Sequence, residues 1–171
     1  MRFITLLLTS FMLTLSAYAQ EKTDASVITG RAAVLEGDTI EINGQKIRLH
    51  GIDAPQHRQT CHDRRGLLYR CGLKSKTALD LFLWSNEINC HILSPDKYGR
   101  KLANCSLGQV DVADWLVRQG HAVAFRKYSY VYINAENEAK KAKRGLWSGK
   151  FRMPWEWRDQ RRYGGDSEYN R

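Results

Sequence analysis

The sequence has no closely spaced pair of cysteines, no internal repeat and no low-complexity tract. The lack of a CxxC-type pair argues against a structural zinc site, because such sites take their ligands from two close pairs. After the first twenty residues, no apolar run is long enough to cross a membrane. In a chain of 171 residues, these absences favour one ordinary folded domain.

Acidic residues are also in deficit, with 18 Asp and Glu against 27 Lys and Arg and a formal net charge of +9. Such a surplus favours phosphate-rich partners over basic ones and disfavours an acidic-surface cytosolic enzyme. The apolar fraction of 43% and the aromatic fraction of 11% suffice for a packed core and exclude a disordered chain.

The amino terminus has the pattern of an export signal. Arg2 is followed by an apolar run over residues 3–15 and by a small-x-small motif at residues 17–19, which predicts a signal peptide over 1–19 that is cleaved. An uncleaved membrane anchor is the alternative, and it is disfavoured because the run is short and has no positively charged flank behind it.

We therefore expect an exported protein, periplasmic or extracellular, with no stable membrane association after cleavage and no need for more than a monomer. A mobile leader over 20–26 would precede a single domain over 27–158, and a polar, basic tail would occupy 159–171. The aromatic residues near the end are expected to cover the core, and residues 158–162 to face solvent.

Four cysteines remain in the mature chain, and in an oxidising compartment an even number favours two disulfides. Segments 87–93 and 101–105 have strand character and flank a glycine-containing turn. A hairpin folded symmetrically about Lys97 and Tyr98 places Cys90 opposite Cys105. The remaining pair, Cys61 and Cys71, then closes a local loop.

Hydrophobic periodicity predicts a β-barrel with helices. Runs rich in β-branched residues predict strands, and Asn43-Gly44 between two of them is a strong hairpin signal. The expected strands are 27–35, 39–42, 46–52 and the two of the cysteine hairpin, and the expected helices are 72–84, 112–119 and 132–143. Five short strands with interleaved helices suit a small closed barrel better than a parallel sheet.

Three stretches carry residues suited to phosphate chemistry: Glu36-Gly37-Asp38-Thr39, the segment from Arg48 to Gln56, and Asp96-Lys97-Tyr98-Gly99-Arg100. Two carboxylates can hold a hard cation such as Ca²⁺, and two arginines can clamp a phosphodiester and neutralise charge in its transition state. Together they are the minimum parts for metal-assisted phosphodiester cleavage.

Two positions within these stretches need a structural explanation. Arg48 and Asp53 are five residues apart, so a regular strand would point them to opposite faces. Gly51, or the strand end near Pro55, must turn the chain if both are to reach one site. Asp96 precedes a tight turn, and we expect its carboxylate to be structural.

The sequence resembles the staphylococcal nuclease (thermonuclease) family over nearly all of the mature chain. Five ordered motifs carry the resemblance: GDT at 37–39, Arg48 with DAP at 53–55, DKYGR at 96–100, WLVRQG at 115–120 and AKRGLW at 142–147. The cysteines and the closing PWEWR at 154–158 are typical of a secreted bacterial branch. The resemblance implies a five-stranded OB-fold barrel with three helices. It also implies a calcium-dependent endonuclease that acts on single-stranded or frayed DNA and RNA and leaves 3′-phosphate ends.

The resemblance assigns a metal site to this sequence. Asp38 and Asp53 match the family's calcium carboxylates, and the backbone carbonyl of Ala54 matches its carbonyl ligand. Thr39 and Glu36 would lie beside the metal.

A phosphate site follows from the same match. Arg48 and Arg100 match the two arginines that hold the scissile phosphate, and a guanidinium fork suits a phosphate better than an ammonium does. Lys97 and Tyr98 match positions near the terminal phosphate of a bound nucleotide.

Gln56 departs from the family pattern, which has Glu there to orient or deprotonate the attacking water. An amide can orient a water but cannot take its proton near neutral pH, and general-base assistance is typically worth about 10²–10⁴-fold. Three alternatives stay open. Gln56 positions a calcium-bound water, or Glu36, His57 or Asp63 serves as a substitute base, or the protein binds nucleic acid without cutting it.

The last alternative would make the chain a non-catalytic OB-fold module for single-stranded nucleic acid. Its basic charge and aromatic residues fit that function equally well, whereas the retained carboxylates and arginines favour the enzyme. Phe125 is a milder departure, since the family tends to have Tyr at that position.

Overall fold

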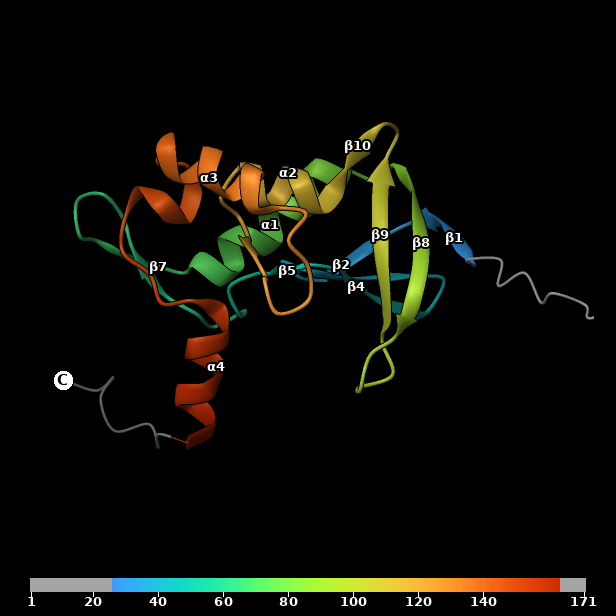
Figure 1. The fold of residues 1–171 in the computed structure, drawn as a ribbon, viewed down its shortest axis with the longest axis horizontal. Coiled ribbons are helices and arrows are strands. Elements are labelled where there is room, and N and C mark those ends of the chain that lie inside the picture. Colours follow the sequence, from blue (N-terminus) through green and yellow to red (C-terminus); the bar gives the residue numbers. More distant parts are fainter. Residues whose placement is uncertain (1–25, 164–171) are drawn as a thin grey trace, which may run out of the picture.

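The computed structural model describes residues 26–163 (Figure 1). The predicted signal peptide, the leader up to residue 25 and the tail from residue 164 lie outside the described residues. Within the described part, no helix combines the length and apolar character that crossing a bilayer requires.

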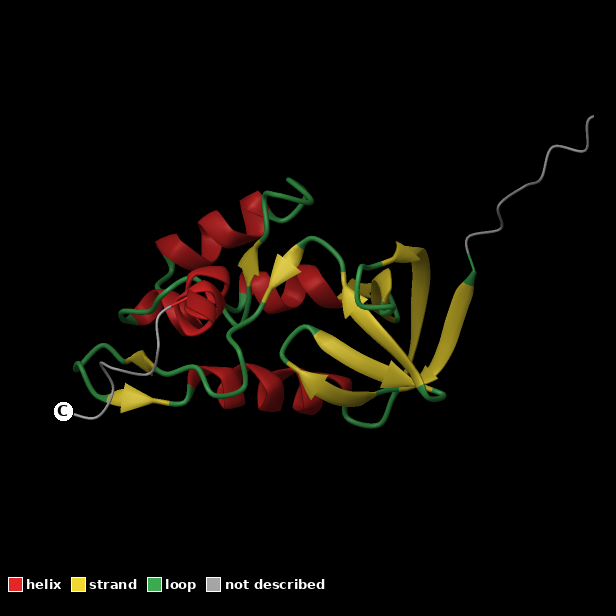
Figure 2. Cartoon of the chain, turned by 90° about the horizontal axis from the view of Figure 1, so that it is seen from below, coloured by secondary structure: helices red, strands yellow, loops and turns green. Residues whose placement is uncertain are grey.

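A curled mixed sheet forms one half of the molecule, and the helices occupy the other (Figure 2). Its strands are β1 Val27–Arg31, β2 Ala33–Glu36, β3 Thr39–Ile42, β4 Gln45–Leu49, β8 Glu87–Pro95, β9 Lys101–Leu107 and β10 Val110–Asp111. They follow the order β1-β8-β9-β4-β3-β2, with β10 added to β9.

Closure of the sheet depends on one bend. Strands β1 and β2 are separated only by Ala32, yet they stand at opposite ends of the strand order. The predicted strand 27–35 is therefore one bent strand that joins both edges, as an OB-type barrel requires. With β1 and β2 counted together, the five expected strands are present, and the β-barrel plus α class is confirmed.

The hairpin signal at Asn43-Gly44 is confirmed by backbone geometry. Asn43 has φ 51° and Gly44 has φ 73°, both in the left-handed region that a two-residue hairpin turn uses. The turn sets the antiparallel register of β3 and β4, in which Ile42 lies opposite Gln45 and Thr39 opposite Arg48. Local turn chemistry thus places Arg48 beside the turn that carries Asp38.

Two pairs of short strands lie outside the main sheet. They are β5 Ile52–Asp53 with β11 Val123–Ala124, and β6 Cys61–His62 with β7 Leu68–Tyr69. The first pair positions Asp53 opposite Val123, and the second forms the stem of the Cys61–Cys71 loop.

The three expected helices are confirmed within two residues at each end, as α1 Cys71–Leu83, α2 Val112–Arg118 and α3 Ile133–Lys141, followed by a 3-10 turn at Gly145–Ser148. Helix α2 begins after Asp111, whose carboxylate accepts hydrogen bonds from the amides of Ala113 and Asp114. This is an ordinary N-cap, with Gly120 just past the helix end.

A fourth helix, α4 Pro154–Tyr163, was not expected from the sequence. It starts with Pro154 at its first position, where proline is well tolerated, and Glu156 lies in its first turn. The helix crosses the boundary that we expected between domain and tail. In Figure 1 it lies on the same side of the molecule as the turn between β8 and β9.

The core has two parts. The larger lies between the barrel and helices α1 to α3 and includes Ile40, Leu49, Leu79 and Leu116, all almost fully buried. The smaller surrounds Cys61, Cys71, Val123 and Leu146, and it is covered by Tyr69, Trp147, Phe151, Met153 and Trp155. The expectation that the carboxyl-terminal aromatic residues cover the core is confirmed by this second cluster.

Both expected disulfides are present. Cys61 pairs with Cys71 and Cys90 with Cys105, ten and fifteen residues apart in sequence. Cys90 also lies directly opposite Cys105 in the β8–β9 ladder, as hairpin symmetry predicted. A register shift between Ile92 and Ser94 moves the turn beyond it by one residue. The bonds are consistent with an oxidising environment.

Removal of the hairpin disulfide in a Cys90→Ala/Cys105→Ala variant is expected to lower the free energy of unfolding by about 3 kcal/mol, because a loop of this length is no longer constrained in the unfolded chain. Urea denaturation of the oxidised proteins measures the change. The Cys61→Ala/Cys71→Ala variant, with a slightly shorter loop, serves as the matched comparison. Variants that both unfold at the wild-type midpoint would contradict this account.

Candidate active site

Arg48 joins the two carboxylates that the sequence singled out. Its Nη1 donates to Asp38 Oδ1 over 2.9 Å, and its Nη2 donates to Asp53 Oδ1 over 3.0 Å. The expected break in the strand occurs at Gly51, which has φ 76° and separates β4 from β5. A side chain at Gly51 would also collide with Tyr132 and Ser129. This turn brings residues five apart in sequence to the same site.

Asp38 lies in the turn between β2 and β3, and its carboxylate is almost completely buried. Its Oδ1 also accepts a hydrogen bond from the Thr39 hydroxyl, and its Oδ2 accepts one from the backbone N–H of Ala54, at 2.9 Å. The segment that follows β5 is therefore tied directly to the β2–β3 turn. Three of the residues assigned to a metal site, Asp38, Asp53 and Ala54, thus form one connected group.

Burial and charge oppose each other in this group. Burial alone would lower the pKa of Arg48, but Asp38 and Asp53 outweigh it and raise the pKa, so the guanidinium is firmly cationic. Burial raises the pKa of Asp53 above its ordinary value, and hydrogen bonds from Arg158 oppose this rise. A buried carboxylate is stable here only because cations accompany it.

Arg158 corrects a sequence expectation. Residues 158–162 were expected to face solvent, yet Arg158 reaches from α4 to Asp53 with both arms of its guanidinium. Its Nη1 donates to Asp53 Oδ1 over 2.8 Å, and its Nη2 donates to Oδ2 over 2.7 Å. A polar tail pattern contains no signal for this contact, because the two residues are 105 positions apart.

Two of the assigned ligands are of a type that suits a hard divalent cation, although the described residues contain no group of three or more His, Cys, Asp or Glu side chains that could hold a metal ion. Asp38 and Asp53 supply two buried carboxylates, each a preferred ligand type for Ca²⁺, and the backbone N–H of Ala54 joins that residue to Asp38. Glu36, at the end of β2, has a buried Oε2 with no hydrogen-bond partner among the described residues. Burial of an oxygen without a partner is costly, and a bound water or ion would compensate it.

A pocket of about 710 Å³ is lined by both arginines that bond to Asp53. Arg48 and Gln56 line it from the barrel, and Arg100, Lys97 and Tyr98 line it from the β8–β9 turn. The opposite walls come from the segment after β11 and from α4, through Phe125, Lys127, Tyr128, Trp155, Arg158 and Asp159. Asp38, Asp53, Ala54, Thr39 and Glu36 do not line the pocket, but Arg48 and Arg158, which do, both bond to Asp53.

Arg100 is held in place by Asp96, which confirms that Asp96 is structural. Asp96 Oδ1 accepts the amides of Tyr98 and Arg100, and its Oδ2 accepts Arg100 Nε over 2.8 Å. Burial alone would raise the pKa of Asp96, but these hydrogen bonds lower it. The β8–β9 turn therefore presents Arg100 to the pocket in a fixed orientation.

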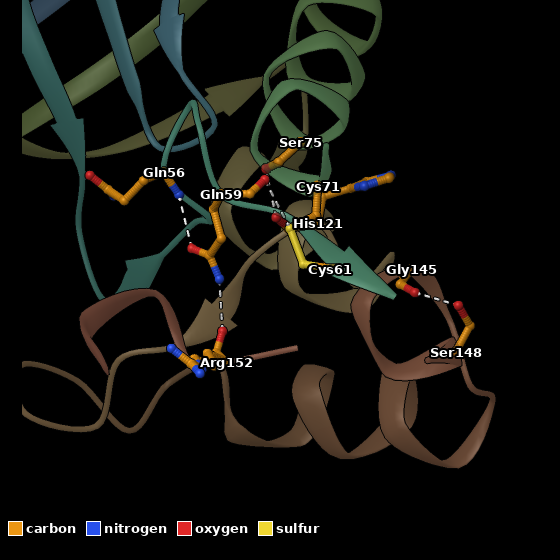
Figure 3. The surroundings of a disulfide bond; sticks show 9 residues. All are labelled: Gln56, Gln59, Cys61, Cys71, Ser75, His121, Gly145, Ser148 and Arg152. Carbon is orange, nitrogen blue, oxygen red and sulfur yellow. Dashed lines mark hydrogen bonds between the residues drawn. A yellow bond between two sulfur atoms is a disulfide. The ribbon is translucent and has the colours of Figure 1, made fainter. Parts of the chain in front are cut away.

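Gln56 is positioned by Gln59, a side chain that sequence reasoning did not single out. Gln59 is fully buried, and its Oε1 accepts the amide of Gln56 while its Nε2 donates to the carbonyl of Arg152 over 2.8 Å. Figure 3 shows this link beside the Cys61–Cys71 disulfide, with the Gln56 side chain extending away from Gln59. The side-chain amide of Gln59 thus connects Gln56 to the segment before α4.

The other candidates for a base lie elsewhere. Asp63 accepts the amides of Arg65 and Leu67 in the turn between β6 and β7, and neither it nor His57 lines the pocket. Phe125, in place of the family's Tyr, stacks on Trp155 with ring centroids 5.3 Å apart. The position therefore anchors α4 in this protein.

Support for Asp53 comes from β11, which pairs with β5 and is itself held by Glu136 of α3. The Glu136 side chain is buried, with Oε1 accepting the amide of Ala124 and Oε2 accepting Arg126 and Lys140. Burial alone would raise the pKa of Glu136, but the two cations outweigh it and lower it.

These features define a small OB-type barrel with a basic pocket over a carboxylate pair, an arrangement suited to a phosphate-bearing ligand. Comparison with known families agrees. The model for staphylococcal nuclease homologues matches residues 46–149, and the chain belongs to that family. The expected family is thus confirmed.

Several curated proteins are similar to this chain. The succinoglycan biosynthesis protein ExoI of Rhizobium meliloti is 40% identical over 126 residues, which cover 72% of this chain and 66% of ExoI. An uncharacterized endonuclease of Haemophilus influenzae is 30% identical over 166 residues, covering 91% of this chain and 85% of that protein. A probable staphylococcal-like nuclease of rice, CAN2, is 30% identical over 128 residues, 72% of this chain and 32% of CAN2. The chain thus spans about two thirds of ExoI and a third of CAN2.

A Glu136→Gln variant is expected to be less stable than the wild type by about 2 kcal/mol at pH 7, because hydrogen bonds between charged groups are lost. Since folding lowers the pKa of Glu136 below its ordinary value of 4.5, its contribution is complete above that value and disappears as the pH falls through the lowered pKa. Chemical denaturation from pH 3 to 7 measures the difference, which should shrink with acidification. A difference that is constant with pH would refute the ionic origin.

Proposed function

We propose that this protein is an exported, calcium-dependent endonuclease that hydrolyses phosphodiester bonds of single-stranded or frayed DNA and RNA to 3′-phosphate ends. The hydrolytic class rests on its family and on relatives named endonucleases. The observation that carries the proposal is the bonding of Asp38 and Asp53 to Arg48, which lines the same pocket as Arg100.

Phosphate binding is the first task of the site. Arg48 and Arg100 both line the pocket, so a phosphodiester bound between them would receive two guanidinium groups. Such groups neutralise the charge that gathers on the phosphate oxygens in the transition state. Arg100 needs no reorganisation to do so, because Asp96 already fixes it. Lys97 and Tyr98 would contact a neighbouring phosphate.

Cation binding is the second task. Asp38, Asp53 and the carbonyl of Ala54 would hold Ca²⁺, with Thr39 and Glu36 beside it. The ion, when bound, supplies Lewis-acid stabilisation of the phosphate and a more acidic water. Arg48 joins both tasks, since it bonds to both carboxylates and lines the pocket.

Gln56 orients the attacking water in this proposal. Its backbone N–H is held by Gln59 Oε1, and Gln56 lines the same pocket as Arg48. The side-chain carboxamide of Gln56 cannot accept a proton near neutral pH. The reaction therefore lacks general-base assistance from this position and is expected to be slow.

A single-stranded nucleic-acid-binding protein is the second candidate function, and Gln56 is the observation that favours it. The pocket has cationic and aromatic walls that would serve binding alone. Either function predicts that affinity falls as salt rises, because phosphate neutralisation releases counterions. The two disulfides and the N-terminal sequence pattern support export to the periplasm or medium, and nothing in the proposed mechanism requires more than a monomer.

Cleavage of single-stranded DNA by the mature, oxidised protein tests the proposal, with Ca²⁺ and with a chelator. We expect calcium-dependent cutting that falls to background in Asp53→Asn. Gln56→Glu should cut at least about tenfold faster, within the range of general-base assistance.

Asp63→Asn is the matched control, because this carboxylate lies in the β6–β7 turn outside the pocket, and its activity should equal that of the wild type. Salt-sensitive binding without cutting by the wild type would instead establish the binding protein. Cutting that persists in the chelator would contradict the calcium requirement.

A further inference from the structure

The contact between Arg158 and Asp53 has a consequence for cation binding. Asp53 is the carboxylate that would hold Ca²⁺ under the proposed function, on which this inference rests. Both of its oxygens accept N–H groups from the Arg158 fork, and Oδ1 also accepts Arg48 Nη2. Three of about four lone-pair positions on this carboxylate are therefore already used.

The charges of the group are also balanced without a metal ion. Asp38 and Asp53 carry two negative charges, and Arg48 and Arg158 carry two positive ones. Within these ion pairs, which do not include Glu36, an incoming divalent cation meets no net negative charge, and it is repelled by the guanidinium that holds Asp53. Because the Asp53 side chain has no exposed surface, solvent screens this repulsion poorly.

Arg48 and Arg158 differ in what else holds them. Arg48 bonds to both carboxylates, lies within the barrel and has only 15% of its side chain exposed. Arg158 bonds to Asp53 alone among the described residues, and 30% of its side chain is exposed at the pocket wall. Arg158 is therefore the cation that can leave Asp53 without breaking the rest of the group.

Helix α4 does not have to move for this exchange. Trp155 stacks on Phe125 with an interplanar angle of 12°, and Gln59 holds the carbonyl of Arg152 just before the helix. Pro154 is buried at the helix start. These contacts keep the helix in place, so rotation of the Arg158 side chain into the pocket suffices to free Asp53.

We propose that Arg158 is an exchangeable counter-cation that competes with the divalent cation for Asp53. In the metal-free protein it neutralises the buried carboxylate, and it is displaced into the pocket when Ca²⁺ binds. Arg158 is thus a positioning residue that sets the affinity of the site for Ca²⁺, and it is supplied by a helix at the far end of the chain.

Calorimetric titration of Ca²⁺ into the metal-free, oxidised protein tests this directly, without any measurement of cleavage. Removal of the competitor in Arg158→Ala should tighten Ca²⁺ binding by about tenfold or more, because charged hydrogen bonds no longer have to break. Arg158→Lys keeps the charge but not the fork, and its affinity should lie between those of Arg158→Ala and the wild type.

Arg152→Ala is the matched control, since this arginine precedes α4 and has an exposed side chain. It should bind Ca²⁺ as the wild type does, and Asp53→Asn should not bind it. Thermal unfolding of each variant verifies that the protein is folded. If Arg158→Ala does not fold, the comparison of Arg158→Lys with the wild type tests the proposal.

The outcomes separate the two proposals. Unchanged or weaker Ca²⁺ binding by folded Arg158 variants, with binding still lost in Asp53→Asn, would overturn the competition and leave the calcium site intact. Absence of Ca²⁺ binding by the wild type and every variant would overturn both.

Discussion

The two carboxylates of Asp38 and Asp53 are buried in this protein, and the surrounding segments supply the hydrogen-bond donors and cations that stabilise their charge. A buried ionised carboxylate without partners costs several kcal/mol, so each one must collect donors from its surroundings. Asp38 takes its donors from β4 and from the segment after β5, and Asp53 takes them from β4 and α4. Four chain segments are thereby joined at one point.

The carboxyl-terminal segment forms part of the pocket wall, through Trp155, Arg158 and Asp159. The aromatic residues after the 3-10 turn pack around the Cys61–Cys71 disulfide, and Gln59 adds a polar link to the same segment (Figure 3). Helix α4 is therefore anchored at its start by apolar packing and one buried amide. Farther along the helix, Arg158 reaches Asp53, so the Cys61–Cys71 disulfide supports the geometry of the site through the helix that packs near it.

Two competing demands meet at the pocket. Cation binding requires carboxylates with accessible lone pairs, whereas the stability of a buried carboxylate requires that its lone pairs accept hydrogen bonds. Fixed partners such as Arg48 and the amide of Ala54 serve stability, and the guanidinium of Arg158 lies at the boundary with the pocket. The side-chain carboxamide of Gln56 is a separate departure from the demands of catalysis, because it can orient a water but cannot deprotonate it.

Local sequence determined much of the fold. Turn chemistry at Asn43-Gly44, the runs rich in β-branched residues and the symmetry of the cysteine hairpin are short-range signals. They predicted the strands, and the two turns also predicted the register of their hairpins. The family resemblance, carried by short ordered motifs, indicated Asp38, Asp53, Arg48 and Arg100 as one site. A break between Arg48 and Asp53 was also expected, because their odd spacing requires one if both reach one site, and the structure places it at Gly51 instead of near Pro55.

Only the tertiary structure decided which residues neutralise those carboxylates. Helix α4 was missed because its pattern reads as a polar, basic tail after a run of aromatic residues, and its stability comes from packing on Phe125 and the disulfide loop. Arg158 and Asp53 are 105 residues apart in sequence, and Gln59 is 93 residues from Arg152, whose carbonyl it binds. An arginine in a basic tail and a glutamine in a loop have no local pattern that distinguishes them from solvated side chains, so their partners emerge only when distant segments meet.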